Sequence, residues 1–241
     1  MTVTYIYHSC YLLEFDGFSV IFDFYQDVER EDGTFWIKDY LLTKEEDLYL
    51  FCTHSHADHF NPEILDWKNR KKNIKQIFCK ELLDAGVVDN SKDILFLDKL
   101  ESYADDRIKV KAFGSTDIGG SFLIEVDGKR IFHAGDLNNW HWNEEVPKIE
   151  ATGYENNYLC ELELLAESVE NLFLAMLPID PRLGTDFMKG AEQFVKRVST
   201  EYLLPMHFGE NYDMVNAFER TAKLQSCKYL KVTRKGESFN L

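Results

Sequence analysis

The feature that most constrains the fold is an apolar run that leads directly into a cluster of histidines. Leu48–Thr53 reads Leu-Tyr-Leu-Phe-Cys-Thr, as expected of a strand covered on both faces. The next six residues, His54-Ser55-His56-Ala57-Asp58-His59, contain three of the seven histidines of the chain. Asn61-Pro62-Glu63 then supplies a helix N-cap, a proline at the first helical position and an acid in the first turn. The sequence therefore predicts a strand, a polar loop and a helix in succession.

Short apolar and β-branched runs alternate with turn signals along the rest of the chain. Hairpin turns are predicted at Asp16-Gly17 and Asp127-Gly128. Helical spacing of apolar residues predicts helices around Leu82 and Leu83, over Asn157–Asn171 and over Phe187–Val198. The predicted strands are Val3–Tyr7, Tyr11–Phe15, Ser19–Phe24, Leu48–Thr53, Ile74–Cys79, Ile94–Leu97, Ile108–Phe113, Ser121–Val126, Arg130–Ala134, Leu172–Leu177 and Tyr202–Pro205. This order predicts an α/β fold in which two β-sheets pack face to face with helices outside.

Length and composition are those of a globular chain without a membrane span. With 241 residues, of which 45% are hydrophobic, the chain is long enough for a substantial core, and we expect one domain over residues 1–241. No run of about eighteen apolar residues exists and no signal peptide is evident, which predicts a cytoplasmic protein without a membrane partner. The five cysteines never form a CxxC pair, so we expect reduced, mostly buried thiols and no thiolate zinc site.

The net charge bears on the kind of partner. A formal charge of -15 repels a polyanion over most of the surface, so nucleic-acid binding is not expected. The basic cluster Lys68–Lys72 is interpreted as the solvated end of a helix and the following turn, with an anion-binding role as the alternative. A small-molecule substrate is the favoured partner, and the formation of a homo-oligomer stays open.

The histidine cluster has the spacing of a chelating site. In extended backbone, residues two apart project to the same side, so His54 and His56 can share one cation while the following turn redirects Asp58 and His59. Imidazole and carboxylate ligands suit zinc, manganese or iron, and the lack of cysteine is typical of hydrolytic sites. The alternative is a polar turn with incidental histidines.

Five segments along the chain resemble the metallo-β-lactamase superfamily. The run from Thr53 to His59 resembles its HxHxDH signature, and Ile131-Phe132-His133-Ala134-Gly135-Asp136 resembles its strand that ends in Gly-Asp. Leu204-Pro205-Met206-His207-Phe208-Gly209 is similar to the segment with the last histidine ligand, and Val20-Ile21-Phe22-Asp23 to an early strand with a supporting aspartate. The start, Tyr7-His8-Ser9-Cys10-Tyr11-Leu12-Leu13, is similar to the opening of the branch that contains ascorbate-6-phosphate lactonases.

The resemblance implies a four-layer αββα sandwich of two mixed sheets and a set of metal ligands. His54 and His56 would bind a first metal, Asp58, His59 and His207 a second, and Asp136 would bridge them. It also implies one or two divalent ions, zinc first and manganese or iron as alternatives, which activate a water molecule. Asp58 would in addition orient that water as the catalytic residue.

The chain departs from the family pattern at Gly114. The family usually places a further first-metal histidine where this chain has glycine in Ala112-Phe113-Gly114-Ser115-Thr116-Asp117. Glycine supplies no ligand, so binding of a single metal at the second site is an alternative to a two-metal centre. Asp117 or His141 could compensate from a loop, and supporting or surface roles are the alternative for both.

Other residues near these segments have open roles. Trp140-His141-Trp142 follows Asp136 and is interpreted either as a substrate wall or as core packing, and His8 and His133 as supports for ligands. The resemblance thus implies a metal-dependent hydrolase that acts on a small ester, lactone or phosphodiester. The alternative is a catalytically decayed metal- or ligand-binding protein on the same fold.

Overall fold

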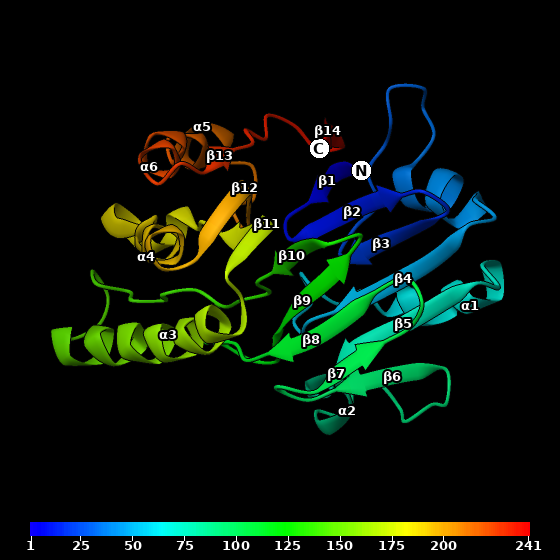
Figure 1. Ribbon diagram of the computed structural model, residues 1–241, viewed down its shortest axis with the longest axis horizontal. Helices are drawn as coiled ribbons and strands as arrows, with labels where there is room; N and C mark the ends of the chain where they lie inside the picture. The colour runs from blue at the N-terminus through cyan, green and yellow to red at the C-terminus, as the bar shows by residue number, and fades with distance from the viewer. The chain divides into compact units, whose positions relative to one another are not determined.

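The computed structural model describes all 241 residues, and the chain forms two compact units. The first unit consists of Met1–Leu97 and Val232–Leu241, and the second of Asp98–Lys231. Each unit is built on one seven-stranded sheet, drawn from blue to cyan with a red edge strand in the first unit and in green to orange in the second (Figure 1).

The sheet of the first unit has the strand order β14-β1-β2-β3-β4-β5-β6. Its strands are β1 (Thr2–Tyr7), β2 (Cys10–Phe15), β3 (Phe18–Phe22), β4 (Asp47–Cys52), β5 (Ile74–Cys79), β6 (Ile94–Leu97) and β14 (Glu237–Asn240). Strands β14 to β3 pair antiparallel, whereas β3 to β6 pair parallel. Its helical segments are η1 (Trp36–Tyr40), η2 (Leu41–Thr43), η3 (Pro62–Asp66), α1 (Trp67–Arg70) and α2 (Glu81–Asp84).

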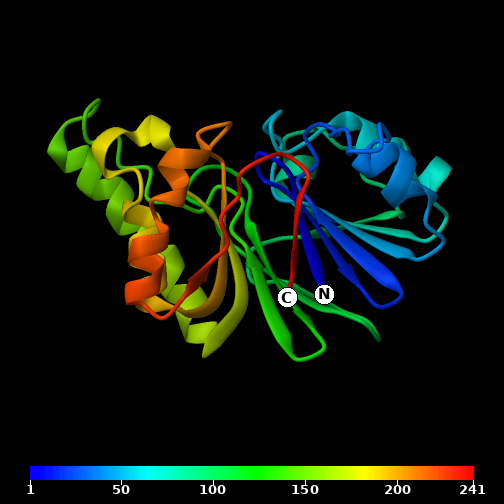
Figure 2. The same ribbon diagram turned by 90° about the horizontal axis from the view of Figure 1, so that it is seen from above.

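The sheet of the second unit has the strand order β13-β12-β11-β10-β9-β8-β7. Its strands are β7 (Ser102–Ala104), β8 (Lys109–Phe113), β9 (Ser121–Val126), β10 (Lys129–His133), β11 (Asn171–Pro178), β12 (Ser199–Met206) and β13 (Lys228–Tyr229). Strands β10 to β13 pair parallel and β7 to β10 antiparallel. The helices α3 (Lys148–Ser168), η4 (Pro181–Asp186), α4 (Lys189–Arg197), α5 (Tyr212–Asn216) and α6 (Glu219–Leu224) lie on one face of this sheet (Figure 2).

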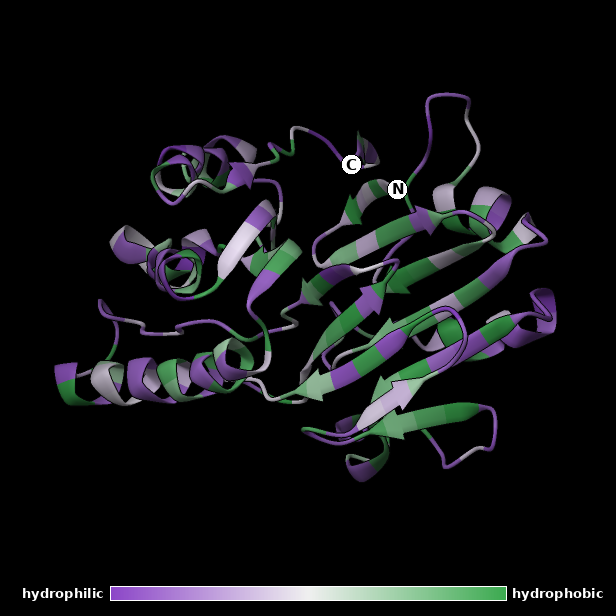
Figure 3. Ribbon diagram, in the orientation of Figure 1, coloured by the Kyte–Doolittle hydropathy of each residue, from purple (hydrophilic) through white to green (hydrophobic).

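Apolar side chains of the strands form the core of each unit. Strand β3 is buried along its whole length, and strands β4 and β11 are buried except near their first residues. Figure 3 shows β3 and β6 in the hydrophobic colour almost throughout, whereas α3 alternates between hydrophobic and hydrophilic residues. Burial of each large apolar side chain contributes about 1.5–3 kcal/mol, so the central strands are the rigid frame that carries the polar loops.

The predicted fold class is confirmed, because two mixed sheets with helices are the elements of the predicted αββα fold. Both predicted hairpins join antiparallel strands, and Asn61 caps η3 by accepting a hydrogen bond from the backbone N–H of Glu63. Four of the five cysteines are buried and all are free thiols, as predicted. The structure contains no helix that is long and apolar enough to cross a membrane.

Three predictions about local structure need correction. The helix predicted over Asn157–Asn171 begins earlier, at Lys148, where the first turns carry no apolar periodicity, and ends at Ser168 because Asn171 starts β11. Strands β7, β13 and β14 and helices α5 and α6 were not predicted, since most are short and weakly patterned. Lys71 is not solvated: it is 4% exposed and donates to the carbonyl of Lys44 at 2.6 Å. Burial lowers the pKa of Lys71.

Candidate metal site

The predicted ligands follow the carboxyl ends of parallel strands in both units. In the first unit, the run His54 to His59 follows β4, one of its four parallel strands. In the second unit, Asp136 follows β10 and His207 comes directly after β12. Loops at the carboxyl ends of parallel strands are the usual place for ligand-binding side chains in α/β proteins.

The histidine run folds into a compact loop. His54 and His59 are fully buried with ring centroids 4.1 Å apart, and the exposed ring of His56 lies 4.8 Å from that of His54. The Cys52 thiol lies at hydrogen-bonding distance from the carbonyls of His54 and His59, at 3.4 and 3.6 Å. Burial, reinforced by the charge of Asp23, raises the pKa of this thiol well above its ordinary value, so it stays protonated as a donor.

Asp23 fixes the orientation of His59. Its Oδ2 atom lies 2.7 Å from His59 Nδ1, and both side chains are fully buried. The same carboxylate accepts bonds from the backbone N–H of Thr53 at 2.8 Å and from the Thr53 hydroxyl at 2.7 Å. A histidine that donates its Nδ1–H to a carboxylate presents the lone pair of Nε2, which is the common arrangement for a metal ligand. The supporting aspartate predicted at Asp23 therefore contacts a predicted ligand.

Asp58 lies beside a histidine from the start of the chain. His8 Nε2 is 3.1 Å from Asp58 Oδ2, and one ligand atom each of His8, Asp58 and His59 lie within 4.8 Å of one another. Glu81 of α2 accepts bonds from the backbone N–H and the hydroxyl of Ser55, at 3.0 and 2.7 Å. These contacts hold both ends of the loop.

His207 in the second unit has the same kind of anchor. Its Nδ1 atom lies 2.9 Å from Asp180 Oδ2, and its Nε2 atom lies 3.5 Å from Asp136 Oδ1. The second distance is longer than an ordinary N–H···O bond of about 2.7–3.2 Å. It is close to the separation of about 3.3 Å between two ligands of one tetrahedral metal with bonds of about 2.0–2.1 Å. The donor set therefore fits a divalent cation.

Arg182 adds a positive charge next to this anchor. Its guanidinium donates to the Asp180 carboxylate through Nε and Nη2, at 2.8 and 2.5 Å, and its side chain is 64% exposed. Burial raises the pKa of Asp180, but the hydrogen bonds from His207 and Arg182 outweigh it, so the pKa lies below its ordinary value. Asp180 is therefore an anion at neutral pH.

Three residues of the candidate site have a left-handed backbone. His8, Asp23 and His207 have φ angles of 57°, 46° and 64°. For residues other than glycine such a conformation is uncommon and costs about 1–3 kcal/mol, and it clusters at functional sites. This strain fits residues that are held for a function.

The aromatic segment after Asp136 lies next to His207. The ring of Trp140 is 5.4 Å from that of His207, edge to face, and its Nε1–H donates to the Asp136 carbonyl at 2.8 Å. Trp142 stacks on Trp140 with ring centroids 6.4 Å apart. His141 is 1% exposed, with Nε2 3.1 Å from the carbonyl of Asp186, so its ring is a support and not a ligand.

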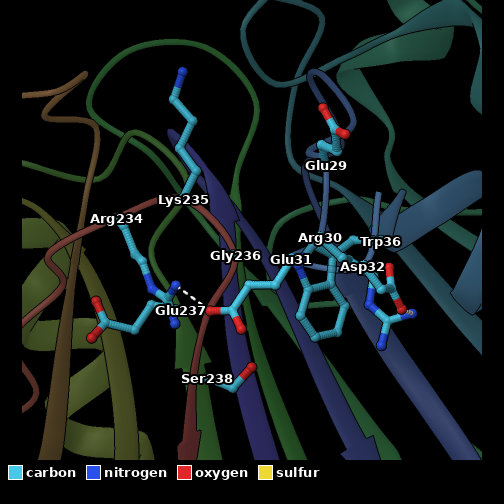
Figure 4. Close-up of a pocket in the computed structure, with 10 residues that line it drawn as sticks. All are labelled: Glu29, Arg30, Glu31, Asp32, Trp36, Arg234, Lys235, Gly236, Glu237 and Ser238. Atoms are coloured by element: carbon cyan, nitrogen blue, oxygen red, sulfur yellow. Dashed lines mark hydrogen bonds and ion pairs between the residues drawn. The ribbon is translucent and has the colours of Figure 1, made fainter. Parts of the chain in front are cut away.

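The candidate ligands do not line the cavity of about 540 Å³ in the first unit. Charged side chains dominate its lining, including the ion pair Arg234–Glu31 at 2.5 Å (Figure 4). Trp36 packs there against Gly236, where a Cβ atom would come within 2.6 Å of the indole nitrogen. The cavity thus marks the packing of the loop at 29–36 against the carboxyl-terminal segment.

Asp180 and Glu81 are the residues of the site that sequence reasoning missed. A usable signal for Asp180 was present, because Asp180-Pro181 after an apolar strand repeats the pattern of Asn61-Pro62. Both are N-caps followed by proline, and the Asp180 side chain accepts from the backbone N–H of Arg182. No local signal marked Glu81, since its partner Ser55 is 26 residues away.

Comparison with known proteins places the chain in a family. The family model "Beta-lactamase superfamily domain" matches residues 2–151, which is more than half of the chain. The chain belongs to the metallo-β-lactamase superfamily.

Three solved structures share the fold over nearly the whole chain. Igni18, a metallo hydrolase from the archaeon Ignicoccus hospitalis, is 18% identical, with a TM-score of 0.69 and full coverage of both chains. YhfI from Bacillus subtilis, a metallo-β-lactamase fold protein, is 11% identical with a TM-score of 0.63 over 99% of both chains. The diiron β-hydroxylase CmlA from Streptomyces venezuelae is 14% identical with a TM-score of 0.69, and the match covers all of this chain but 54% of CmlA.

Proposed function

We propose that the protein is a metal-dependent hydrolase that cleaves a small ester, lactone or phosphodiester. The observation that carries the proposal is the repeated anchor in which a buried carboxylate holds a histidine Nδ1, Asp23 on His59 and Asp180 on His207. A structural histidine does not need its Nε2 lone pair fixed in this way, whereas a metal ligand does. Structural similarity supports the same conclusion, since one protein of similar fold, Igni18, is named a metallo hydrolase.

The proposed ligand set is the one that the family resemblance implies. His54 and His56 with Asp136 would hold one cation, and Asp58, His59 and His207 with Asp136 a second, as the family resemblance implies. A bound divalent cation would lower the pKa of a water molecule far below its value in bulk water, toward neutral pH, and polarise the scissile bond. Asp58 would orient the attacking water, and His8 would hold the Asp58 carboxylate in place.

Zinc, manganese and iron are all candidates for the bound metal. Zinc suits imidazole with carboxylate, and manganese or iron suits a set richer in oxygen. One structurally similar protein, CmlA, is a diiron enzyme, so we keep iron among the candidates. We retain the lactonase-like branch as a guide to which substrates to test.

The proposal is tested with purified wild-type protein, the variant His59→Ala and the matched variant His141→Ala. His141 is also a buried histidine, but both of its ring nitrogens already have hydrogen-bond partners. Nε2 lies near the carbonyl of Asp186, and Nδ1 lies near the backbone N–H of Asn143. Bound metal is measured by elemental analysis, and turnover is measured on a panel of phosphodiesters and lactones. We expect wild type and His141→Ala to bind metal and to hydrolyse at least one substrate class, and His59→Ala to lose metal and most of the activity.

Two outcomes contradict the proposal. Undetectable metal in wild-type protein, or turnover that His59→Ala leaves unchanged, removes the basis for a metallohydrolase. Tight metal binding with no turnover on any ester, lactone or phosphodiester would instead favour the alternative, a catalytically decayed metal-binding protein.

A further inference from the structure

The family's additional histidine position is closed by a carboxylate in this chain. Gly114 follows β8 and does not have a left-handed backbone, so its conformation does not require glycine. Its surroundings are tight, because an added Cβ would lie 2.3 Å from Glu161 Oε2. Glu161 comes from α3, and its other oxygen forms an ion pair with Lys99 at 2.6 Å. A histidine at position 114 would therefore require the Glu161 carboxylate to move.

The next acid along the same loop lies beside Asp136. One ligand oxygen each of Asp117 and Asp136 lie within 4.8 Å of one another. The loop is fixed by Thr116, whose hydroxyl donates to the carbonyl of Asn138 at 2.6 Å and lies 2.9 Å from the backbone nitrogen of Asn138. These bonds therefore connect Thr116, the residue before Asp117, to the segment that begins with Asp136.

The two carboxylates of Asp117 and Asp136 are suited to bind a cation. Asp136 is 3% exposed, and two charged carboxylates this close together are stabilised either by a shared cation or by a proton on one of them. Asp117 is exposed, so a cation can reach it from solvent. His141, the other residue that could compensate for Gly114, has its Nε2 atom 3.1 Å from a backbone carbonyl.

We propose that Asp117 supplies the ligand that Gly114 cannot, which rests on the metal site of the proposed function. Within the second unit, Asp117 then joins Asp136 as a ligand of the first metal, with a carboxylate in place of the family's imidazole. For manganese and iron, a carboxylate oxygen is a better ligand than an imidazole nitrogen. The replacement should therefore reduce the ratio of zinc affinity to manganese affinity at this site. The departure at Gly114 is thus a change of ligand and not the loss of a site.

The test measures metal binding without any substrate. Wild type, Asp117→Asn and the control Asp106→Asn, an exposed loop acid of the same unit, are titrated separately with Zn²⁺ and Mn²⁺ by equilibrium dialysis. We expect wild type and the control to bind two equivalents and Asp117→Asn to lose the weaker one. The affinity for that ion should fall more than about a hundred-fold, because even the loss of an outer partner of a ligand costs about 10–100-fold. Thermal melting of the metal-free proteins checks that each variant is folded.

The outcomes separate this inference from the proposed function. No metal in wild type contradicts both, whereas unchanged affinities in Asp117→Asn contradict this inference alone. If wild type binds one equivalent, its loss in Asp117→Asn supports the inference, and its retention at wild-type affinity overturns it. Asp117→His provides a second readout: we expect a higher ratio of zinc to manganese affinity than in wild type, and an unchanged ratio argues against Asp117 as a ligand.

Discussion

The two units anchor a histidine in the same way but in different surroundings. In the first unit, Asp23 follows β3 and His59 follows the neighbouring parallel strand β4. In the second unit, Asp180 follows β11 and His207 follows the neighbouring parallel strand β12. In both, the carboxylate lies within 2.9 Å of the histidine Nδ1. Neighbouring parallel strands end at the same edge of a sheet, so the backbone itself brings acid and imidazole together.

The difference lies in what else the carboxylate contacts. The other partners of Asp23 are the backbone N–H and hydroxyl of Thr53, both neutral and buried. Asp180 shares its carboxylate with the guanidinium of Arg182, which is 64% exposed. The first anchor therefore has only buried partners, whereas the second is buried but also pairs with an exposed guanidinium that solvent and salt can reach. We expect the first to matter for stability and binding together, and the second mainly for binding.

The largest effect is expected from Asp23→Asn. Asparagine keeps the shape and tolerates the φ of 46°, but it cannot replace the charge that faces His59. The Asp23 carboxylate accepts three hydrogen bonds, and bonds to a charged group contribute about 1.5–3 kcal/mol each, so we expect a loss of about 3–5 kcal/mol in the free energy of unfolding. The affinity for the metal that His59 holds should fall about 10–100-fold. Denaturant unfolding and equilibrium dialysis measure both.

Asp127→Asn is the matched control for this substitution. Asp127 also has a left-handed backbone, with a φ of 50°, but it lies in an exposed hairpin turn. We expect its stability to stay within about 0.5 kcal/mol of wild type. Equal losses in the two variants would show that backbone strain, and not the contact with His59, determines the result.

A smaller effect is expected from Asp180→Asn. The asparagine oxygen can still accept from the backbone N–H of Arg182 and so preserve the cap of η4. The bond from His207 to an anion is lost, which should weaken metal binding about 10–100-fold and stability by about 1–3 kcal/mol. Asp105→Asn serves as the control, because the Oδ1 atom of Asp105 likewise accepts from backbone N–H groups, those of Arg107 and Ile108, and not from a histidine. A stability loss as large as that of Asp23→Asn would contradict the proposed difference between the anchors.

The first anchor was more accessible to sequence reasoning than the second. Asp23 and His59 both lie in segments that resemble the family, whereas Asp180 lies in none of those segments. Most strands and both hairpins were predicted because period-two patterns and turn residues are local signals. Strand β3 pairs with β4, and β11 with β12, through residues that are distant in sequence. No local sequence pattern therefore indicates which strands are neighbours.

The roles at Gly114 show the limit of pattern matching. The sequence identified the departure from the family, but it could not show that Glu161 of α3 fills the space at Gly114. It also left Asp117 and His141 as equal candidates for compensation. Burial and hydrogen bonding separate them, since His141 is 1% exposed and contacts a carbonyl, whereas Asp117 is exposed beside Asp136. Such side-chain environments depend on tertiary packing.

The smallest effect is expected from Arg182→Gln. The pair of Arg182 with Asp180 is short, but its cationic side is largely exposed, and exposed pairs contribute about 0–1 kcal/mol. We therefore expect a stability loss below about 1 kcal/mol and a loss of metal affinity below about ten-fold, since Asp180 still anchors His207. Raising the salt concentration should reduce the difference between wild type and variant, because salt screens exposed charges. Arg197→Gln, which removes the surface pair with Glu163, is the control for stability and should leave metal affinity unchanged. If Arg182→Gln weakens metal binding as much as Asp180→Asn, then the guanidinium and not the carboxylate determines the orientation of His207, and the two anchors are not built alike.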